Sequence, residues 1–151
     1  MDRRTRLQRG PTQIDPVEHM LAACRGLLID NLPVEVSGPE VPGLDGSAKT
    51  MVEMFKQAGV VDQRAPARTF QLDQPIYVRD GEATLVALPT EDTSLTLQYI
   101  ATFADPDVEG GSLQLEVNPA SFENELAPAR TFCLASEVEA LRSQLAAAGP
   151  A

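Results

Sequence analysis

The chain contains 151 residues, of which 43% are hydrophobic, and its formal net charge is -10. This composition suffices for the core of one ordinary globular domain or two small ones. The excess of acidic residues argues against a surface that neutralises phosphates, so the sequence predicts no nucleic-acid partner.

Hydropathy and cysteine spacing indicate where the protein resides. The sequence contains no run of roughly 20 apolar residues that could span a membrane, and no apolar segment follows the N-terminal arginines as it would in a signal peptide. We therefore expect a cytoplasmic protein without a transmembrane segment. Cys24 and Cys133 lie far apart and outside any CxxC pattern, which predicts two small buried hydrophobic residues rather than a disulfide or a thiolate metal site.

The N-terminus carries a short cationic run of Arg3, Arg4, Arg6 and Arg9. Such a run is typical of a solvated tail, and the alternative is an edge strand with outward-facing charges.

The first helix is predicted from Asp-Pro-Val-Glu at residues 15–18, which has the pattern of a capping box with proline at the first helical position. The helix is expected to run to about Arg25, with Gly26 as the left-handed residue that ends it. Helical spacing places its apolar face on Val17, Met20, Leu21, Cys24 and Leu27.

Two further elements are expected before residue 60. Alternation in residues 32–36 predicts a half-buried strand. After a turn rich in glycine and proline, Ser47 is placed to cap a second helix over about residues 48–58, which Gly59 ends. Asp45, in the same turn, is expected to hydrogen-bond its own backbone and brace the start of this helix rather than touch a substrate.

The pattern changes from helical to alternating after Gly59, and the polar segment 62–67 predicts a unit boundary near residue 62. In the second unit, Asp80-Gly81 is a preferred two-residue turn and predicts a hairpin between residues 75–79 and 82–88. Alternation at residues 94–103 and 112–117 predicts two strands of one antiparallel sheet.

Two helices are predicted near the C-terminus. Asn118-Pro119 should cap a short helix that carries Phe122 and Leu126. Ser136 and Glu139 form the pattern of a second capping box, for a helix that uses Val138, Leu141 and Leu145.

One six-residue string, Ala-Pro-Ala-Arg-Thr-Phe, occurs at residues 65–70 and again at residues 127–132. Six residues are too few to establish a repeat architecture.

The single histidine, His19, directly follows Glu18. At 100° per residue it falls opposite the expected core face and beside Ala22 and Ala23, where small side chains would let another body approach the backbone. An imidazole on a rigid helix can bind zinc, and a neighbouring carboxylate can act as a general base for metal-bound water. The alternatives are an exposed histidine and a glutamate that only caps the helix.

Seven runs of sequence occur in a distinctive order. They are Val-Glu-His-Met-Leu-Ala-Ala at 17–23, Gly-Leu-Leu-Ile-Asp-Asn at 26–31, Gly-Pro-Glu-Val-Pro at 38–42, Leu-Asp-Gly-Ser-Ala at 44–48, Ser-Phe-Glu at 121–123, Ala-Pro-Ala-Arg-Thr-Phe at 127–132 and Glu-Val-Glu at 137–139. In this order the runs resemble the middle portion of the UDP-3-O-acyl-N-acetylglucosamine deacetylase family.

The resemblance implies an α+β fold of two similar units, each a two-layer sandwich of sheet and helices, with a zinc site between them. Residues 1–62 would be the C-terminal part of the first deacetylase domain, and residues 63–151 the N-terminal part of the second.

The resemblance also implies the site residues. His19 would be a zinc ligand, Glu18 the general base, Thr131 a hydroxyl donor to the oxyanion and Phe132 a residue beside the substrate. From the residues alone, Thr131 and Arg130 could equally hold a loop together.

The sequence departs from the family pattern in its ligands. The family has a later His-x-x-x-Asp motif that supplies two zinc ligands, and a further catalytic histidine, whereas this chain has one histidine. The strands that open the first domain are also absent. Because a catalytic zinc needs three protein ligands, we expect an incomplete site, incomplete sheets and a chain that is inactive by itself.

The resulting expectation is a zinc-dependent deacetylase of lipid A biosynthesis that acts on a UDP-linked acylated glucosamine, with a partner chain as one source of the missing segments. The alternative is a non-catalytic remnant that acts as a binding or assembly module. An unrelated small α+β module would require the ordered matches to arise by chance.

Overall fold

The computed structural model describes residues 4–91, 93–103, 108–135, 137–139 and 142–143. In chain order the elements are strands β1 (Leu7–Arg9) and β2 (Thr12–Ile14), helices α1 (Glu18–Gly26) and α2 (Lys49–Ala58), strands β3 (Ile76–Asp80), β4 (Ala83–Ala87), β5 (Leu95–Ala101) and β6 (Gly111–Val117), helix α3 (Pro119–Ser121) and the π-helical segment η1 (Phe122–Leu126). Helices and antiparallel sheets coexist, so the predicted α+β class is confirmed. No helix in the described ranges is long and apolar enough to cross a membrane.

Of the described N-terminal arginines, Arg9 lies in a hairpin, and Arg4 and Arg6 just before it are held by ion pairs, so they do not form a solvated tail. Strand β1 pairs antiparallel with β2, from Leu7 opposite Ile14 to Arg9 opposite Thr12. Arg4 and Arg6 both form ion pairs with Asp15, which is 7% exposed. A nearly buried carboxylate needs such partners, and it therefore draws the arginines against the start of α1.

Helix α1 starts without the predicted capping box. Asp15 is paired with arginines, and the N-cap residue Val17 makes no side-chain capping bond. The predicted end near residue 25 is confirmed, because α1 ends at Gly26. The left-handed residue after it is Leu28 (φ 57°), however, and not Gly26.

The predicted strand at residues 32–36 is wrong. These residues are irregular, and three apolar side chains among them remain 42–45% exposed, namely Leu32, Val34 and Val36. A strand needs a neighbour for its backbone groups, and the described part of the chain places none beside this segment.

The second helix forms as predicted, one residue later. Helix α2 spans Lys49–Ala58, and the Ser47 hydroxyl accepts a hydrogen bond from the Lys49 amide at 3.2 Å. Gly59 ends the helix with φ 86°, a value that strains residues with a Cβ.

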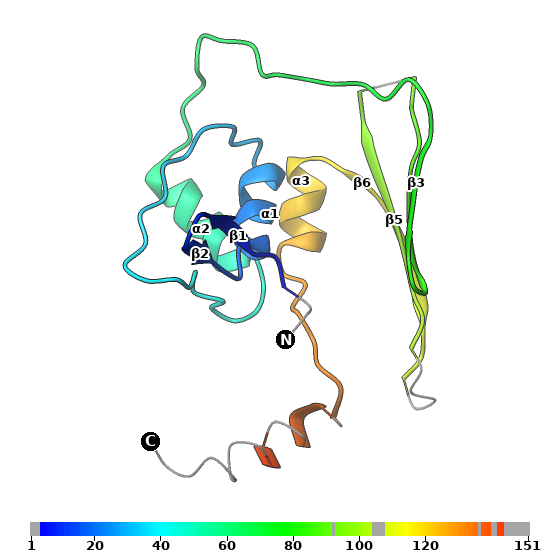
Figure 1. Ribbon diagram of the computed structural model, residues 1–151. Coiled ribbons are helices and arrows are strands. Elements are labelled where there is room, and N and C mark those ends of the chain that lie inside the picture. Colours follow the sequence, from blue (N-terminus) through cyan, green and yellow to red (C-terminus); the bar gives the residue numbers. More distant parts are fainter. Residues whose placement is uncertain (1–3, 92, 104–107, 136, 140–141, 144–151) are drawn as a thin grey trace.

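Both predicted antiparallel pairs are confirmed (Figure 1). In the β3–β4 hairpin Asp80 pairs with Ala83, so the loop is Gly81-Glu82, one residue later than predicted. Gly81 has φ 56°, which explains why a glycine stands there. The β5–β6 pair runs from Leu95 opposite Val117 to Ala101 opposite Gly111.

The short helix after β6 is also confirmed. The Asn118 side chain accepts hydrogen bonds from the Ala120 and Ser121 amides, both at 3.0 Å. The last predicted helix is described only at residues 137–139 and 142–143, which are helical, and at Ala135. Its predicted residues Ser136, Leu141 and Leu145 lie outside the described residues.

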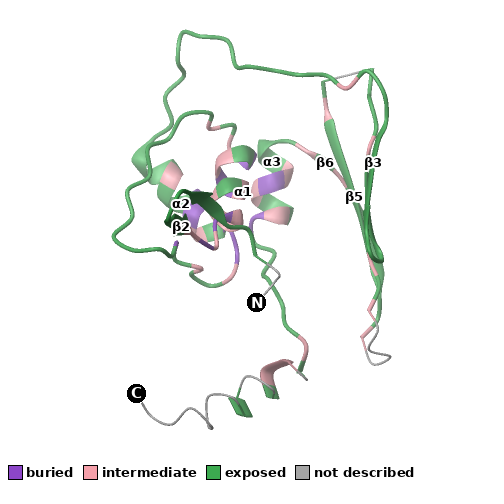
Figure 2. Ribbon diagram, in the orientation of Figure 1, coloured by how far each residue is buried: buried purple, intermediate pink, exposed green. Residues whose placement is uncertain are grey.

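The buried core lies in the helical part of the molecule, where α1, α2 and the α3–η1 helix meet (Figure 2). Its buried members are Val17, Ala23, Val41, Ala48, Met51, Val52, Phe122 and Ala127. Residues from both sides of the predicted boundary near residue 62 therefore contribute to one core. The hairpins β3–β4 and β5–β6 are largely exposed in the same view.

Candidate functional site

The predicted core face of α1 is confirmed in part: Val17 is buried, and Met20 and Leu27 pack against the core. Ala23 is 0% exposed and Gly26 is buried, whereas Leu21 is 43% exposed. His19 precedes Ala23 by four residues and Gly26 by seven, so the three residues share one face of the helix. His19 is half-buried at the N-terminal end of this core-facing side.

The close approach expected at the small-residue surface of α1 does occur, and the approaching body is the chain itself. A Cβ added to Gly26 would collide with the ring of Phe122. Residue size widened the core face beyond the prediction: the large apolar group at this contact comes from η1, and α1 supplies alanine and glycine to make room for it.

Glu18 is bound to the segment before β1. Its Oε2 accepts a hydrogen bond from the Thr5 amide at 2.9 Å, and the Thr5 carbonyl accepts one from the Val17 amide at 3.2 Å. The imidazole of His19 makes no hydrogen bond to another described residue. The segment around Thr5 thus positions Glu18, and it makes no hydrogen bond to the imidazole of His19.

Thr131 lies against the turn before α2, residues 44–48, which we call the docking turn. Three hydrogen bonds join the two segments: Ala48 N–H to the Ala127 carbonyl at 3.0 Å, Arg130 Nε to the Asp45 carbonyl at 2.8 Å, and Thr131 N–H to the Gly46 carbonyl at 2.8 Å. Residues far apart in sequence are therefore fixed to one another at the start of α2.

Asp45 braces the docking turn as predicted. Its Oδ1 accepts hydrogen bonds from the Ser47 amide at 3.0 Å and from the Ser47 hydroxyl at 2.7 Å. Ser47 is 0% exposed. These two bonds and the nearby Arg130 guanidinium lower the pKa of the Asp45 carboxyl from its ordinary value, because all three favour the charged form.

Phe132 packs elsewhere. It is 60% exposed, and its ring meets that of Phe103 edge to face, with the ring centroids 5.6 Å apart. No hydrogen bond among the described residues joins Glu18 or His19 to Thr131 or Phe132. The four predicted site residues thus lie in three local environments: the start of α1, the docking turn and the segment after β5.

The donor groups present do not form a complete zinc site. Among the described residues, no group of three or more His, Cys, Asp and Glu side chains could hold a metal ion. Burial raises the pKa of the half-buried Cys24 thiol, which disfavours a thiolate ligand on α1. Cys133 is exposed, in contrast to the prediction, and both cysteines are free, as predicted. Of the four predicted site residues, His19 remains the candidate zinc ligand.

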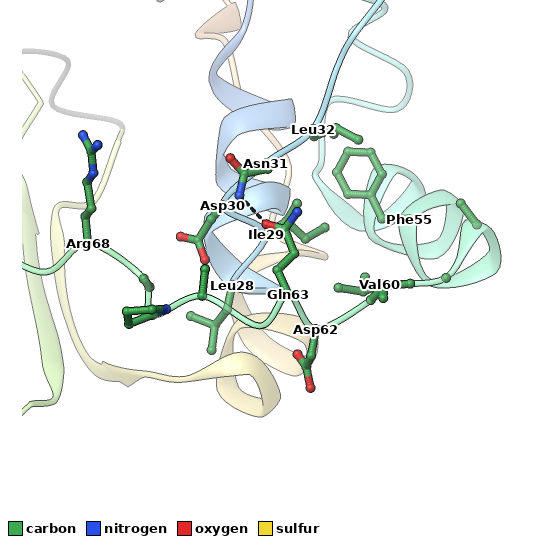
Figure 3. A pocket seen from close by; sticks show the side chains of 16 residues that line it. Leu28, Ile29, Asp30, Asn31, Leu32, Phe55, Val60, Asp62, Gln63 and Arg68 are labelled. Atoms are coloured by element: carbon green, nitrogen blue, oxygen red, sulfur yellow. Dashed lines mark hydrogen bonds between the residues drawn. The ribbon is translucent and has the colours of Figure 1, made fainter.

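A cavity of about 850 Å³ lies beside the helical core (Figure 3). Its walls come from residues 28–32, the end of α2 and the segment that follows, and the Asn31 amide donates to Gln63 Oε1 at 2.6 Å across it. None of the predicted site residues lines this cavity. Sequence reasoning missed it because most of its walls are irregular segments without a periodic pattern.

Comparison with known proteins agrees with the sequence motifs. A family model described as "LpxC: UDP-3-O-acyl N-acetylglycosamine deacetylase" matches residues 1–151. A UDP-3-O-acyl-N-acetylglucosamine deacetylase from Anaeromyxobacter sp. (strain Fw109-5) is 40% identical over 89% of this chain and 43% of its own length. One from Anaeromyxobacter dehalogenans (strain 2CP-C) is 37% identical over 96% of this chain and 46% of its own length.

The family model and both relatives are named as deacetylases, so the chain is related to this class of protein. More particularly, it belongs to the UDP-3-O-acyl N-acetylglycosamine deacetylase family. The resemblance found in residues 17–48 and 121–139 is thereby confirmed. The chain spans less than half the length of these two curated relatives.

Proposed function

We propose that this polypeptide is part of a zinc-dependent deacetylase that hydrolyses the N-acetyl amide of UDP-3-O-acyl-N-acetylglucosamine in lipid A biosynthesis, in the cytoplasm. The observation that carries the proposal is the family match over residues 1–151, together with relatives of that name at 37–40% identity. We also propose that the two units predicted on either side of residue 62 correspond to parts of two deacetylase domains.

The proposed roles follow the chemistry of amide hydrolysis. Glu18 accepts the proton of the attacking water, and Thr131 donates a hydrogen bond to the oxyanion that develops on the carbonyl. Phe132 lies beside the substrate. Hydrogen bonds fix two of these residues in separate places, Glu18 at the start of α1 and Thr131 at the docking turn, so the support for these roles comes from the family match.

His19 is the one zinc ligand that the described residues offer to this proposal. A catalytic zinc takes three protein ligands, and the donor set here does not supply the other two. We therefore propose that these 151 residues do not hydrolyse the substrate alone, and that the remaining ligands come from residues outside them.

A second candidate function is a non-catalytic binding or assembly module. The observation that favours it is the large apolar surface of the hairpins, where Tyr77 is 62% exposed, Leu85 62% and Tyr99 68%. Large exposed apolar side chains are common at sites of association.

Zinc titration by calorimetry tests the two functions against each other. The chain is titrated alone and together with the part of the Anaeromyxobacter dehalogenans relative that it does not match. We expect tight zinc binding only in the mixture, accompanied by acetate release from UDP-3-O-acyl-N-acetylglucosamine, and we expect His19→Ala to remove both.

The matched control is Cys24→Ser, on the same helix, which should leave zinc binding unchanged because the thiol is disfavoured as a thiolate. Neither zinc binding nor acetate release in the mixture would contradict the deacetylase proposal and favour the binding module.

A further inference from the structure

The docking turn is more than a connection between two helices, because residues 127–131 are bonded to it along their length. The Ala127 carbonyl, the Arg130 side chain and the Thr131 amide each bond to a different residue of the turn, namely Ala48, Asp45 and Gly46. Two of these bonds use carbonyls of the turn as acceptors, so the shape of the turn decides where Thr131 lies.

The shape of the turn depends on the Asp45 carboxylate. Oδ1 bonds both polar hydrogen donors of Ser47, its amide and its hydroxyl, across a single intervening residue. That residue is Gly46, whose φ of 82° directs its carbonyl to the Thr131 amide. A left-handed residue enclosed by such a carboxylate bridge has little freedom to reorient.

The turn also contacts the side chain of Thr131. A Cβ at Gly46 would lie 3.0 Å from Thr131 Cγ2, which is closer than ordinary van der Waals contact. With its methyl group packed against Gly46, Thr131 has its hydroxyl in a different staggered position. Thr131 itself is exposed, so the hydroxyl remains accessible.

The chain contains its own comparison for this effect. Residues 65–70 have the same six-residue sequence as residues 127–132, yet all six are exposed, and Phe70 is 89% exposed. No hydrogen bond among the described residues fixes them. The hexapeptide therefore does not impose its own conformation, and the docking turn supplies the constraint on the second copy.

We propose that Asp45 is a positioning residue: its carboxylate sets the shape of the docking turn, and the turn fixes the backbone and the methyl group of Thr131. The use of the Thr131 hydroxyl in catalysis rests on the proposed deacetylase function. The positioning itself does not, since it requires neither zinc nor substrate.

Hydrogen–deuterium exchange measured by NMR on the 151-residue chain tests the proposal. The Thr131 amide should exchange about tenfold more slowly than the Thr69 amide in the unbonded copy, the protection expected of one net backbone hydrogen bond. Asp45→Ala should remove this difference. Asp45→Asn should retain most of it, because the amide oxygen still accepts from Ser47.

The Ala23 amide, in α1, reports whether a variant has unfolded globally. If Asp45→Ala also loses protection at Ala23, the variant has unfolded, and Gly46→Ala is measured in its place. This variant displaces Thr131 and leaves the carboxylate unchanged. Equal exchange of Thr131 and Thr69 in the parent chain, or unchanged Thr131 exchange in both variants, would overturn the proposal. An inactive assembled enzyme with intact Thr131 protection would instead contradict the deacetylase function alone.

Discussion

The shape of the docking turn depends directly on the ionisation of Asp45. The hydrogen bond from the Ser47 hydroxyl lowers the pKa of the Asp45 carboxyl most, followed by the bond from the Ser47 amide, and the charge of Arg130 lowers it further, so the pKa lies below the ordinary 3.8. A lowered pKa in the folded state means that folding favours the carboxylate over the acid.

The contribution of Asp45 to stability should therefore be complete above pH 3.8 and be lost as the pH falls through its lowered pKa. The carbon chemical shift of the Asp45 carboxyl, followed by NMR against pH, measures that pKa directly. Ser47→Ala should return it toward 3.8, whereas Ser37→Ala, at an exposed serine, should leave it unchanged. Titration of the parent carboxyl at or above 3.8 would contradict this account.

The packing of α1 against η1 depends on one residue with no side chain. Gly26 is buried inside the last turn of α1, where alanine would ordinarily favour the helix by roughly 1 kcal/mol. The ring of Phe122 occupies the space that a Cβ would need, so the two elements approach each other more closely than any larger residue permits.

We expect Gly26→Ala to lower the free energy of unfolding by about 1–3 kcal/mol, the usual cost of overpacking, in spite of the gain in helix propensity. Denaturant unfolding at equilibrium measures the change. Gly38→Ala is the matched control, because a Cβ there meets nothing within 4 Å. Recovery of stability in Gly26→Ala combined with Phe122→Leu would identify the ring as the cause, and a stabilising Gly26→Ala alone would refute it.

Elements that are specified by local sequence could be predicted, and those that depend on distant partners could not. The helices α2 and α3 and both antiparallel pairs were found from spacing and turn residues, with ends within one or two residues. The strand expected at residues 32–36 failed, because alternation describes one strand but not the neighbour that it needs.

The candidate site shows the same limit. The family motifs singled out Glu18, His19 and Thr131, and local turn chemistry explained Asp45. Two contacts could not be foreseen. The Thr5 amide reaches Glu18, and Phe122 covers the alanine and glycine face of α1. Both are non-local, and the second extended the core-facing side of α1 to the face that carries His19.

The whole molecule exposes far more surface than a compact monomer of its size. Its accessible surface is 12852 Å² at a mass of 16.2 kDa, whereas about 7,500 Å² is expected for a compact folded monomer of that mass. The two large hairpins are mostly exposed in Figure 2. Large apolar side chains on them are exposed as well, including Tyr77, Leu85, Leu97 and Tyr99.

Native protein should therefore bind a hydrophobic dye such as ANS, because exposed apolar area of this extent is what such dyes detect. Tyr99→Lys should reduce the fluorescence, and Gln98→Lys, at the adjacent exposed position of β5, should change it little. A chain that sedimented as a monomer, melted in one sharp transition and gave no dye signal would show that this surface is covered in solution.

The docking turn also sets an order of events during protein synthesis. The turn and α1 are made long before Phe122 and residues 127–131, which complete the core and bond to the turn. A nascent chain therefore carries an open turn, and the first Ala-Pro-Ala-Arg-Thr-Phe segment leaves the ribosome before the second. The final arrangement can form only after translation has passed residue 131, so the N-terminal helices cannot close their core as they emerge.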